Sequence, residues 1–198
     1  MGEPQLFDLE AYLERIEYRG VLEPTLATLQ GVHRAHLASI PFENIDVRLG
    51  RPIGLDLETL QGKLVAGGRG GYCFEQNSLF AAALGALGYE VATLEARVRP
   101  PGAKATLART HMVLHLTVDG QEWIADVGFG ADGPLVPVPL NGAASEQSDD
   151  VYRIEREQDS TCVLRRSWRG TWRDLYAFTL NPALPIDFEM ANYFTSTH

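Results

Sequence analysis

The spacing of apolar residues changes near residue 90, and this change constrains the fold more than any other feature of the sequence. Before residue 90, apolar residues recur every three or four positions, as in helices that bury one face. After it, they recur at every second position, as in strands. A run of helices followed by a run of strands indicates an α+β protein. We therefore predict a helical domain over residues 1–88 and a β domain over residues 89–180.

The helical part contains four predicted helices, whose ends follow from capping residues, prolines and glycines. The β part contains six predicted strands, a two-residue hairpin turn at Asp119-Gly120 and a polar loop over residues 141–150. A new segment over residues 181–198 starts at Asn181-Pro182 and stops without a stop signal. We expect the helices after Asp8, from Pro24, from Leu57 to Gly67-Gly68, and from Cys73 or Phe74 to Leu87 with Gly88 as the C-cap. We expect the strands at residues 90–98, 111–118, 121–127, 151–157, 161–168 and 171–180.

Charge and cysteine content exclude several classes of protein. The net charge is −9 and the sequence has no basic stripe, so we expect no nucleic-acid partner. The two cysteines, Cys73 and Cys162, form neither a disulfide framework nor a CxxC pair for zinc. The N-terminus has no signal pattern, and the longest apolar stretch, residues 79–87, is too short to span a bilayer. We therefore expect a cytoplasmic protein without a membrane partner.

Cys73 is the leading candidate for a nucleophile. It follows a loop in which four glycines surround Arg69, and it lies at the predicted start of a helix. Free N–H groups at a helix N-terminus favour a thiolate, and they can donate to an oxyanion on an acyl group. The alternative is a glycine-rich loop beside a small buried cysteine. A phosphate-binding loop is excluded because no Gly-Lys-Ser/Thr sequence follows. Cys162 has no such surroundings, and we interpret it as structural.

A cysteine nucleophile needs a base, and the predicted hairpin places two histidines near an aspartate. If Asp119-Gly120 form the turn, Asp126 lies opposite Val113, and both His111 and His115 are its diagonal neighbours. The register alone cannot choose between them, although His111 is nearer to the strand end. The alternatives are a half-exposed strand residue for His115 and a turn-bonding residue for Asp126. We interpret His33 and His36 as structural residues beside an apolar helix face.

Four segments, in this order, resemble motifs of the arylamine N-acetyltransferases. Together they are far more specific than any one motif, and they are spread over most of the chain. They are Pro41-Phe42-Glu43-Asn44, Arg69-Gly70-Gly71-Tyr72-Cys73-Phe74-Glu75-Gln76-Asn77, Arg109-Thr110-His111-Met112 and Asp126-Val127-Gly128-Phe129-Gly130.

This resemblance implies a helical bundle followed by an antiparallel β-barrel, with a triad arranged as in cysteine proteinases. It assigns Cys73 as the nucleophile, His111 as the base and Asp126 as the orienting group, which settles the choice of histidine. It also implies a two-step reaction in which acetyl-coenzyme A acetylates Cys73. An arylamine, a hydrazine or an arylhydroxylamine then accepts the acetyl group. No metal is implied.

The resemblance also assigns residues around the triad. It implies a structural ion pair between Arg69 and Glu43, and an acceptor pocket lined by Phe42, Phe129 and Gly130. The alternative for the two phenylalanines is a plain aromatic core, which is compatible with that role.

Members of this family continue into a third, lid-like α/β domain, of which residues 181–198 match only the start of the linking segment. We therefore expect most of the lid to be absent and the coenzyme A site to be incomplete. Three alternatives remain open. They are an amide synthase that uses another acyl thioester, a papain- or transglutaminase-like hydrolase, and a truncated form with little activity that forms homo-oligomers through the surface the lid would cover.

Overall fold

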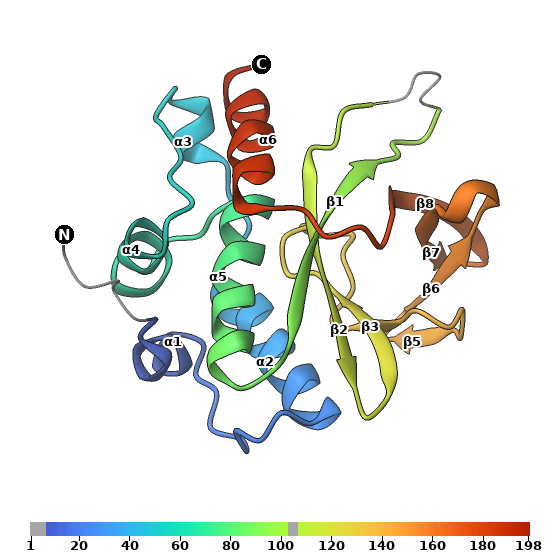
Figure 1. Cartoon of the computed structure of the whole chain (residues 1–198), viewed down its shortest axis with the longest axis horizontal. Helices are drawn as coiled ribbons and strands as arrows, with labels where there is room; N and C mark the ends of the chain where they lie inside the picture. Colours follow the sequence, from blue (N-terminus) through green and yellow to red (C-terminus); the bar gives the residue numbers. More distant parts are fainter. Residues whose placement is uncertain (1–6, 103–106) are drawn as a thin grey trace.

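The computed structural model describes residues 7–102 and 107–198. The N-terminal segment in which we noted no signal pattern lies almost entirely in residues 1–6, outside the described residues. The chain forms helices first and strands second, and a last helix returns to the helical half (Figure 1). The helices are α1 (Leu9–Arg15), α2 (Leu26–Ser39), α3 (Ile45–Arg48), α4 (Leu57–Leu60), the π-helix η1 (Gln61–Ala66), α5 (Cys73–Ala86), the 3₁₀ helix η2 (Gln158–Ser160) and α6 (Pro185–Thr197).

Helix α5 is the centre of the helical half. Its residues are buried on most sides, because the other helices pack against one side and strands β1 (Val91–Val98) and β2 (His111–Val118) against the other (Figure 1). A helix that is apolar nearly all round is expected in such a position. Gly88 follows its C-terminus with a φ of +91°, a conformation that glycine adopts without strain.

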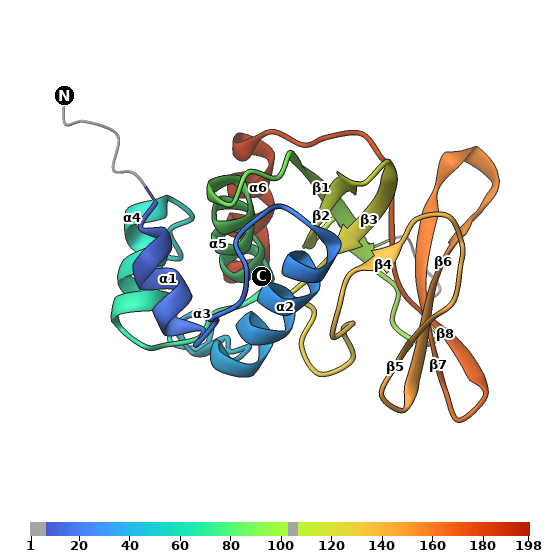
Figure 2. The same ribbon diagram turned by 90° about the horizontal axis from the view of Figure 1, so that it is seen from below.

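Eight strands form one antiparallel sheet in the order β4-β3-β2-β1-β8-β7-β6-β5. The sheet curls into a nearly closed barrel (Figure 2). Its core contains buried side chains such as Leu94, Ile124 and Leu164. The opposite face of β2 packs against the helices through Met112 and Leu114. The remaining strands are β3 (Gln121–Ala125), β4 (Val138–Pro139), β5 (Ser145–Gln147), β6 (Asp150–Arg156), β7 (Cys162–Trp168) and β8 (Thr171–Phe178).

The predicted α+β fold, with helices followed by an antiparallel barrel, is confirmed. The hairpin between β2 and β3 also has the predicted register, since Val118 pairs with Gln121. Asp119 and Gly120 have φ values of +52° and +77°, as the tight turn requires.

Several local predictions were wrong or incomplete. The second helix starts at Leu26 rather than Pro24, because the Thr25 hydroxyl caps it by accepting from the Thr28 N–H at 3.2 Å. The polar loop at 141–150 contains β5, which is held by backbone pairing to β6 rather than by an apolar pattern. The segment 181–198 is mostly helix α6. Helix α3 and strand β4 were not predicted, because they are only a few residues long.

None of the helices within residues 7–102 and 107–198 combines the length and the apolar character needed to cross a bilayer.

Candidate active site

Cys73 is the first residue of α5, and the glycine loop before it is held by the segment Pro41–Glu43. Backbone hydrogen bonds join Gly71 N–H to Pro41 O at 3.3 Å and Glu43 N–H to Gly71 O at 3.0 Å. A Cβ atom on Gly70 would lie only 2.0 Å from Pro41 O, so no larger residue fits there. Two of the segments singled out in the sequence therefore form one structural unit that fixes the start of α5.

His111 and Asp126 form a buried pair next to Cys73. His111 Nε2 lies 2.7 Å from Asp126 Oδ2, and both side chains are almost fully buried. The Cys73 thiol is 3.5 Å from Thr110 O, at the residue before His111. The structure thus brings Cys73, His111 and Asp126 together at the junction of α5 with the sheet.

The charges of this pair are strongly coupled. Burial by itself lowers the pKa of His111, but the charge of Asp126, its hydrogen bond and the nearby Cys73 side chain raise that pKa well above its usual value. Burial by itself raises the pKa of Asp126, but His111 and two further donors bring it below its usual value. The arrangement therefore favours an imidazolium beside an ionised carboxylate.

His115 lies elsewhere. It pairs with Ile124 in the ladder, and its Nε2 is 3.0 Å from Glu122 Oε1 near the protein surface. Asp126 contacts His111 and not His115, because β3 ends at Ala125 and the chain beyond it carries Asp126 towards His111.

Asn77, which the sequence reasoning missed, connects α5 to Asp126. Its Nδ2 donates to Asp126 Oδ1 at 2.9 Å and to Met112 O at 2.8 Å, and its Oδ1 accepts from Val127 N–H at 3.0 Å. Gly128 N–H also donates to Asp126 Oδ1, at 2.9 Å. Its position four residues after Cys73 places both side chains on one face of α5, but this spacing does not point to Asp126.

His33 and His36 are fully buried, and each makes one donor and one acceptor contact, as a neutral ring requires. Asp126 N–H donates to His33 Nε2 at 3.3 Å, so His33 Nδ1 donates to Leu135 O at 3.0 Å. His36 lies between the Tyr12 hydroxyl, at 2.8 Å, and Gln76 Oε1, at 2.6 Å. Both rings support the core around the site.

Because His33 and His36 are buried in the neutral form, we expect the protein to be less stable in acid. Burial lowers the pKa of His33 to about 4 and that of His36 to about 3, against 6.5 for an exposed histidine. Below pH 6.5 the unfolded chain therefore binds protons that the folded chain does not, and protonation favours unfolding. We expect the free energy of unfolding, measured with guanidinium chloride, to fall by roughly 3 kcal/mol or more between pH 6.5 and pH 4. His36→Gln should flatten this slope, and a stability that stays constant down to pH 4.5 would contradict the expectation.

Phe129 lies against His111, and Gly130, the next residue in the chain, lies close to Phe42. The ring of Phe129 meets that of His111 edge-on, with centroids 5.2 Å apart. A Cβ atom on Gly130 would lie 3.6 Å from Phe42 Cγ, and Phe42 is 48% exposed. Tyr176, which the sequence reasoning missed, contacts both rings, with centroids 5.0 Å from His111 and 5.2 Å from Phe129.

Charged side chains surround the base of the glycine loop. Arg69 Nη2 lies 2.7 Å from Glu43 Oε1, so the two residues expected to pair are in contact. Lys63, Asp46 and Glu75 join them, and the sequence reasoning missed all three.

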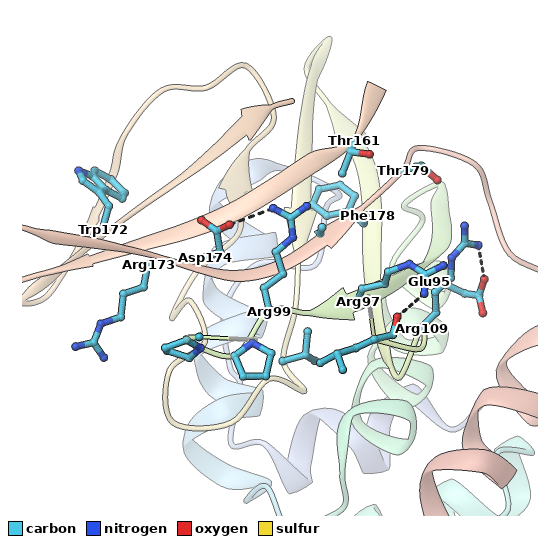
Figure 3. A pocket seen from close by; sticks show the side chains of 16 residues that line it. Glu95, Arg97, Arg99, Arg109, Thr161, Trp172, Arg173, Asp174, Phe178 and Thr179 are labelled. Atoms are coloured by element: carbon cyan, nitrogen blue, oxygen red, sulfur yellow. Dashed lines mark hydrogen bonds and ion pairs between the residues drawn. The ribbon is translucent and has the colours of Figure 1, made fainter. Parts of the chain in front are cut away.

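A separate hollow of about 790 Å³ opens at the ends of β1 and β8 (Figure 3). Its walls include Arg97, Arg99, Arg109 and Arg173. Arg99 is paired with Glu157 and Asp174, and Arg109 is paired with Glu95. Arg109 immediately precedes Thr110, so this cationic hollow lies beside the chain segment that contacts the Cys73 thiol.

Cys162 is buried inside the barrel, where burial raises the pKa of its thiol. Across the described ranges, no three side chains of His, Cys, Asp or Glu gather closely enough to hold a metal ion.

Known proteins resemble this chain over most of its length. The model of a family described as N-acetyltransferase matches residues 25–198. The arylamine N-acetyltransferase of Mycobacterium tuberculosis (strain H37Rv) is 41% identical over 198 residues, covering 96% of this chain and 69% of that protein. The Salmonella typhimurium arylamine N-acetyltransferase / N-hydroxyarylamine O-acetyltransferase is 38% identical over 189 residues, which cover 95% of this chain and 67% of that protein.

Solved structures give the same result. That of the arylamine N-acetyltransferase from Salmonella typhimurium superposes with a TM-score of 0.92 at 37% identity, covering 96% of this chain and 69% of that chain. A Mycobacterium marinum arylamine N-acetyltransferase in complex with CoA superposes with a TM-score of 0.90 at 38% identity. The match covers 96% of this chain and 72% of that chain. The fold and the matched residues thus define a transferase of the N-acetyltransferase class. Within that class, the chain belongs to the arylamine N-acetyltransferase family of enzymes.

Proposed function

We propose that Cys73, His111 and Asp126 act as a catalytic triad that transfers an acetyl group from acetyl-coenzyme A to an arylamine or a hydrazine. O-acetylation of arylhydroxylamines is part of the same proposal, and the similarity to the N-hydroxyarylamine O-acetyltransferase of Salmonella typhimurium supports it. The observation that carries the proposal is the buried contact of 2.7 Å between His111 Nε2 and Asp126 Oδ2 beside a cysteine at a helix start. In this contact Asp126 occupies Nε2, so Nδ1 is the ring nitrogen left to exchange a proton with the Cys73 thiol.

The first step forms an acetyl-enzyme. His111, as an imidazolium, already holds the proton of the thiol, and the Cys73 Sγ thiolate attacks the thioester carbonyl of acetyl-coenzyme A. The backbone N–H groups in the first turn of α5 stabilise the negative oxygen that develops. The bond from the carbonyl carbon to the sulfur of coenzyme A then breaks, and the imidazolium of His111 returns its proton to that leaving thiolate.

The second step releases the acetyl group. The nitrogen of the acceptor attacks the carbonyl of acetyl-Cys73, and its proton passes to His111. The bond to Cys73 Sγ breaks, the amide leaves, and the proton returns to the thiol. Phe42, Phe129 and Gly130 are proposed to line the acceptor site, where aromatic rings pack well against an aromatic amine.

The cationic hollow supports an anionic donor. The phosphate groups of coenzyme A require local positive charge on a protein whose net charge is −9. Arg97 and Arg109 border the hollow next to the segment that contacts Cys73, and guanidinium groups suit phosphate oxygens. The M. marinum relative in complex with CoA supports the same donor.

Mass spectrometry of the intact protein tests the proposal. After incubation with acetyl-coenzyme A we expect a mass increase of one acetyl group on Cys73, which disappears when an arylamine is added. Cys73→Ser should show no thioester adduct, whereas His115→Gln should behave as the unchanged protein because His115 lies outside the site. Absence of an adduct on Cys73 would overturn the proposal. An adduct formed only from other acyl thioesters would instead favour an amide synthase.

A further inference from the structure

A cluster of charged side chains lies under the glycine loop and has no part in the chemistry described above. It is largely shielded from solvent, since the side chains of its lysine and three carboxylates are at most 14% exposed. Burying charges is costly unless each one is paired, so the arrangement of the cluster needs an explanation. Its members are Glu43, Asp46, Lys63, Arg69 and Glu75.

Lys63 is the centre of this cluster. Its Nζ lies 2.7 Å from Glu75 Oε1, 2.9 Å from Asp46 Oδ2 and 4.0 Å from Glu43 Oε1. Lys63 belongs to the π-helix η1, which continues α4 with a wider turn. π-Helical turns are rare and occur frequently at functional sites.

Glu75 connects Lys63 to the nucleophile. It lies in the first turn of α5, two residues after Cys73, and its side chain is 3% exposed. While Oε1 contacts Lys63, Oε2 accepts from the Tyr72 N–H at 3.0 Å. The carboxylate thereby holds the backbone immediately before Cys73, as in a capping box. A Cβ atom on Gly71 would lie 2.8 Å from Glu75 Oε2, so the carboxylate also packs tightly under the loop.

We infer that Lys63 is a positioning residue for Cys73, which it holds in place through Glu75 and the first turn of α5. The inference rests on the proposed role of Cys73 as the nucleophile. It goes beyond the ion pair of Arg69 and Glu43, because Lys63 is the cation that contacts the nucleophile helix directly.

The electrostatics of Glu75 explain why a lysine is needed. Burial raises the pKa of Glu75, and Lys63 opposes this effect through its hydrogen bond and charge. Removing only one partner of a buried pair leaves an uncompensated charge, whereas removing both relieves it. Without Lys63, the charged carboxylate of Glu75 lies buried near those of Asp46 and Glu43 with no lysine to neutralise it. We expect it to move towards solvent, which breaks its contact with the Tyr72 N–H.

The experiment compares Lys63→Met with the double variant Lys63→Met/Glu75→Gln. The readout is the rate at which iodoacetamide alkylates Cys73, followed by mass spectrometry, together with kcat and KM for acetyl transfer. We expect Lys63→Met to slow alkylation and lower kcat about tenfold or more, since small displacements of a reacting group have effects of this size. In the double variant, the glutamine oxygen still accepts from the Tyr72 N–H and needs no cation, so both rates should recover to those of Glu75→Gln alone.

Arg51→Met is the matched control. Arg51 is 62% exposed and contacts the same Asp46 from the surface at 3.2 Å, so its removal should leave both rates unchanged. Alkylation of Cys73 at the original rate in Lys63→Met would overturn the inference. So would a deficit that persists in the Glu75→Gln background, and this comparison decides the matter even if Lys63→Met alone does not fold. Alkylation needs no acyl donor, so the result is readable whether or not acetyl-coenzyme A acetylates the protein.

Discussion

Asp126→Asn is expected to lower kcat by roughly 10⁴-fold while the protein stays folded, an effect known for the equivalent change in a serine protease triad. The asparagine oxygen can keep the position of Oδ1, where it accepts from Asn77 and the Gly128 N–H. Its NH₂ group then faces His111 Nε2, where a carboxylate oxygen had been. This turns His111 Nε2 into an acceptor and moves the ring proton to Nδ1, so the ring can no longer take a proton from Cys73.

Steady-state kinetics and single-turnover acetylation should measure this loss, and circular dichroism and thermal unfolding should show that the fold remains. The variant also separates the two interpretations of Asp126 that the sequence left open. A residue that only bonded a turn N–H would lose little activity as asparagine, since the amide oxygen can still accept. A decrease in kcat of less than about tenfold would therefore contradict the proposed role of Asp126 in orienting the base.

Gly128→Ala has the second-largest expected effect. A Cβ atom on Gly128 would lie 2.7 Å from Cys73 Cα, 2.7 Å from Asn77 Nδ2 and 2.8 Å from Cys73 O. Two of these atoms belong to the backbone of α5, so the helix start has to move. We expect a loss of about 1–3 kcal/mol in the free energy of unfolding, as is typical of overpacked cores. A displacement of Cys73 by about 1 Å is expected to reduce kcat on the order of 100-fold.

Gly85→Ala is the matched control for this change. It lies in the same helix α5, and a Cβ atom there would have no neighbour within 4 Å. Alanine should favour the helix over glycine by about 1 kcal/mol, so stability should rise slightly and kcat should not change. Chemical denaturation measures the change in stability, and steady-state kinetics measures kcat. If Gly128→Ala has the same kcat as Gly85→Ala, the close packing of Gly128 on Cys73 has no importance for catalysis.

Much of the fold could be predicted because local patterns agreed with the global arrangement. Asp119-Gly120 specified a hairpin turn, and the turn specified the register that puts Asp126 near the first residue of β2. Register also left His111 and His115 equivalent, because both are two residues from Val113 in the same strand. The difference between them lies in the end of β3 at Ala125, a backbone feature that no alternating pattern records.

Other parts of the site depend on contacts between distant segments and could not be read from spacing. Asn77 is an ordinary polar residue in the sequence, and only the packing of α5 on β2 brings it to Asp126. Lys63 is similar, since a helical pattern does not distinguish an α-turn from the π-turn that η1 adopts. Strand β5 is held by its backbone pairing with β6 and by the buried side chain of Gln147, and its own residues are polar.

The proposed nucleophile and its base come from different halves of the molecule. Cys73 belongs to the helical half, whereas His111 and Asp126 belong to the sheet, and they meet only where α5 packs on β2. A chain that has folded only its helices therefore carries a cysteine without a base, and its thiol has no more reactivity than its helix start provides. During synthesis the helices emerge first. The Cys73 thiol therefore acquires its base only after β2 has been made and has packed on α5.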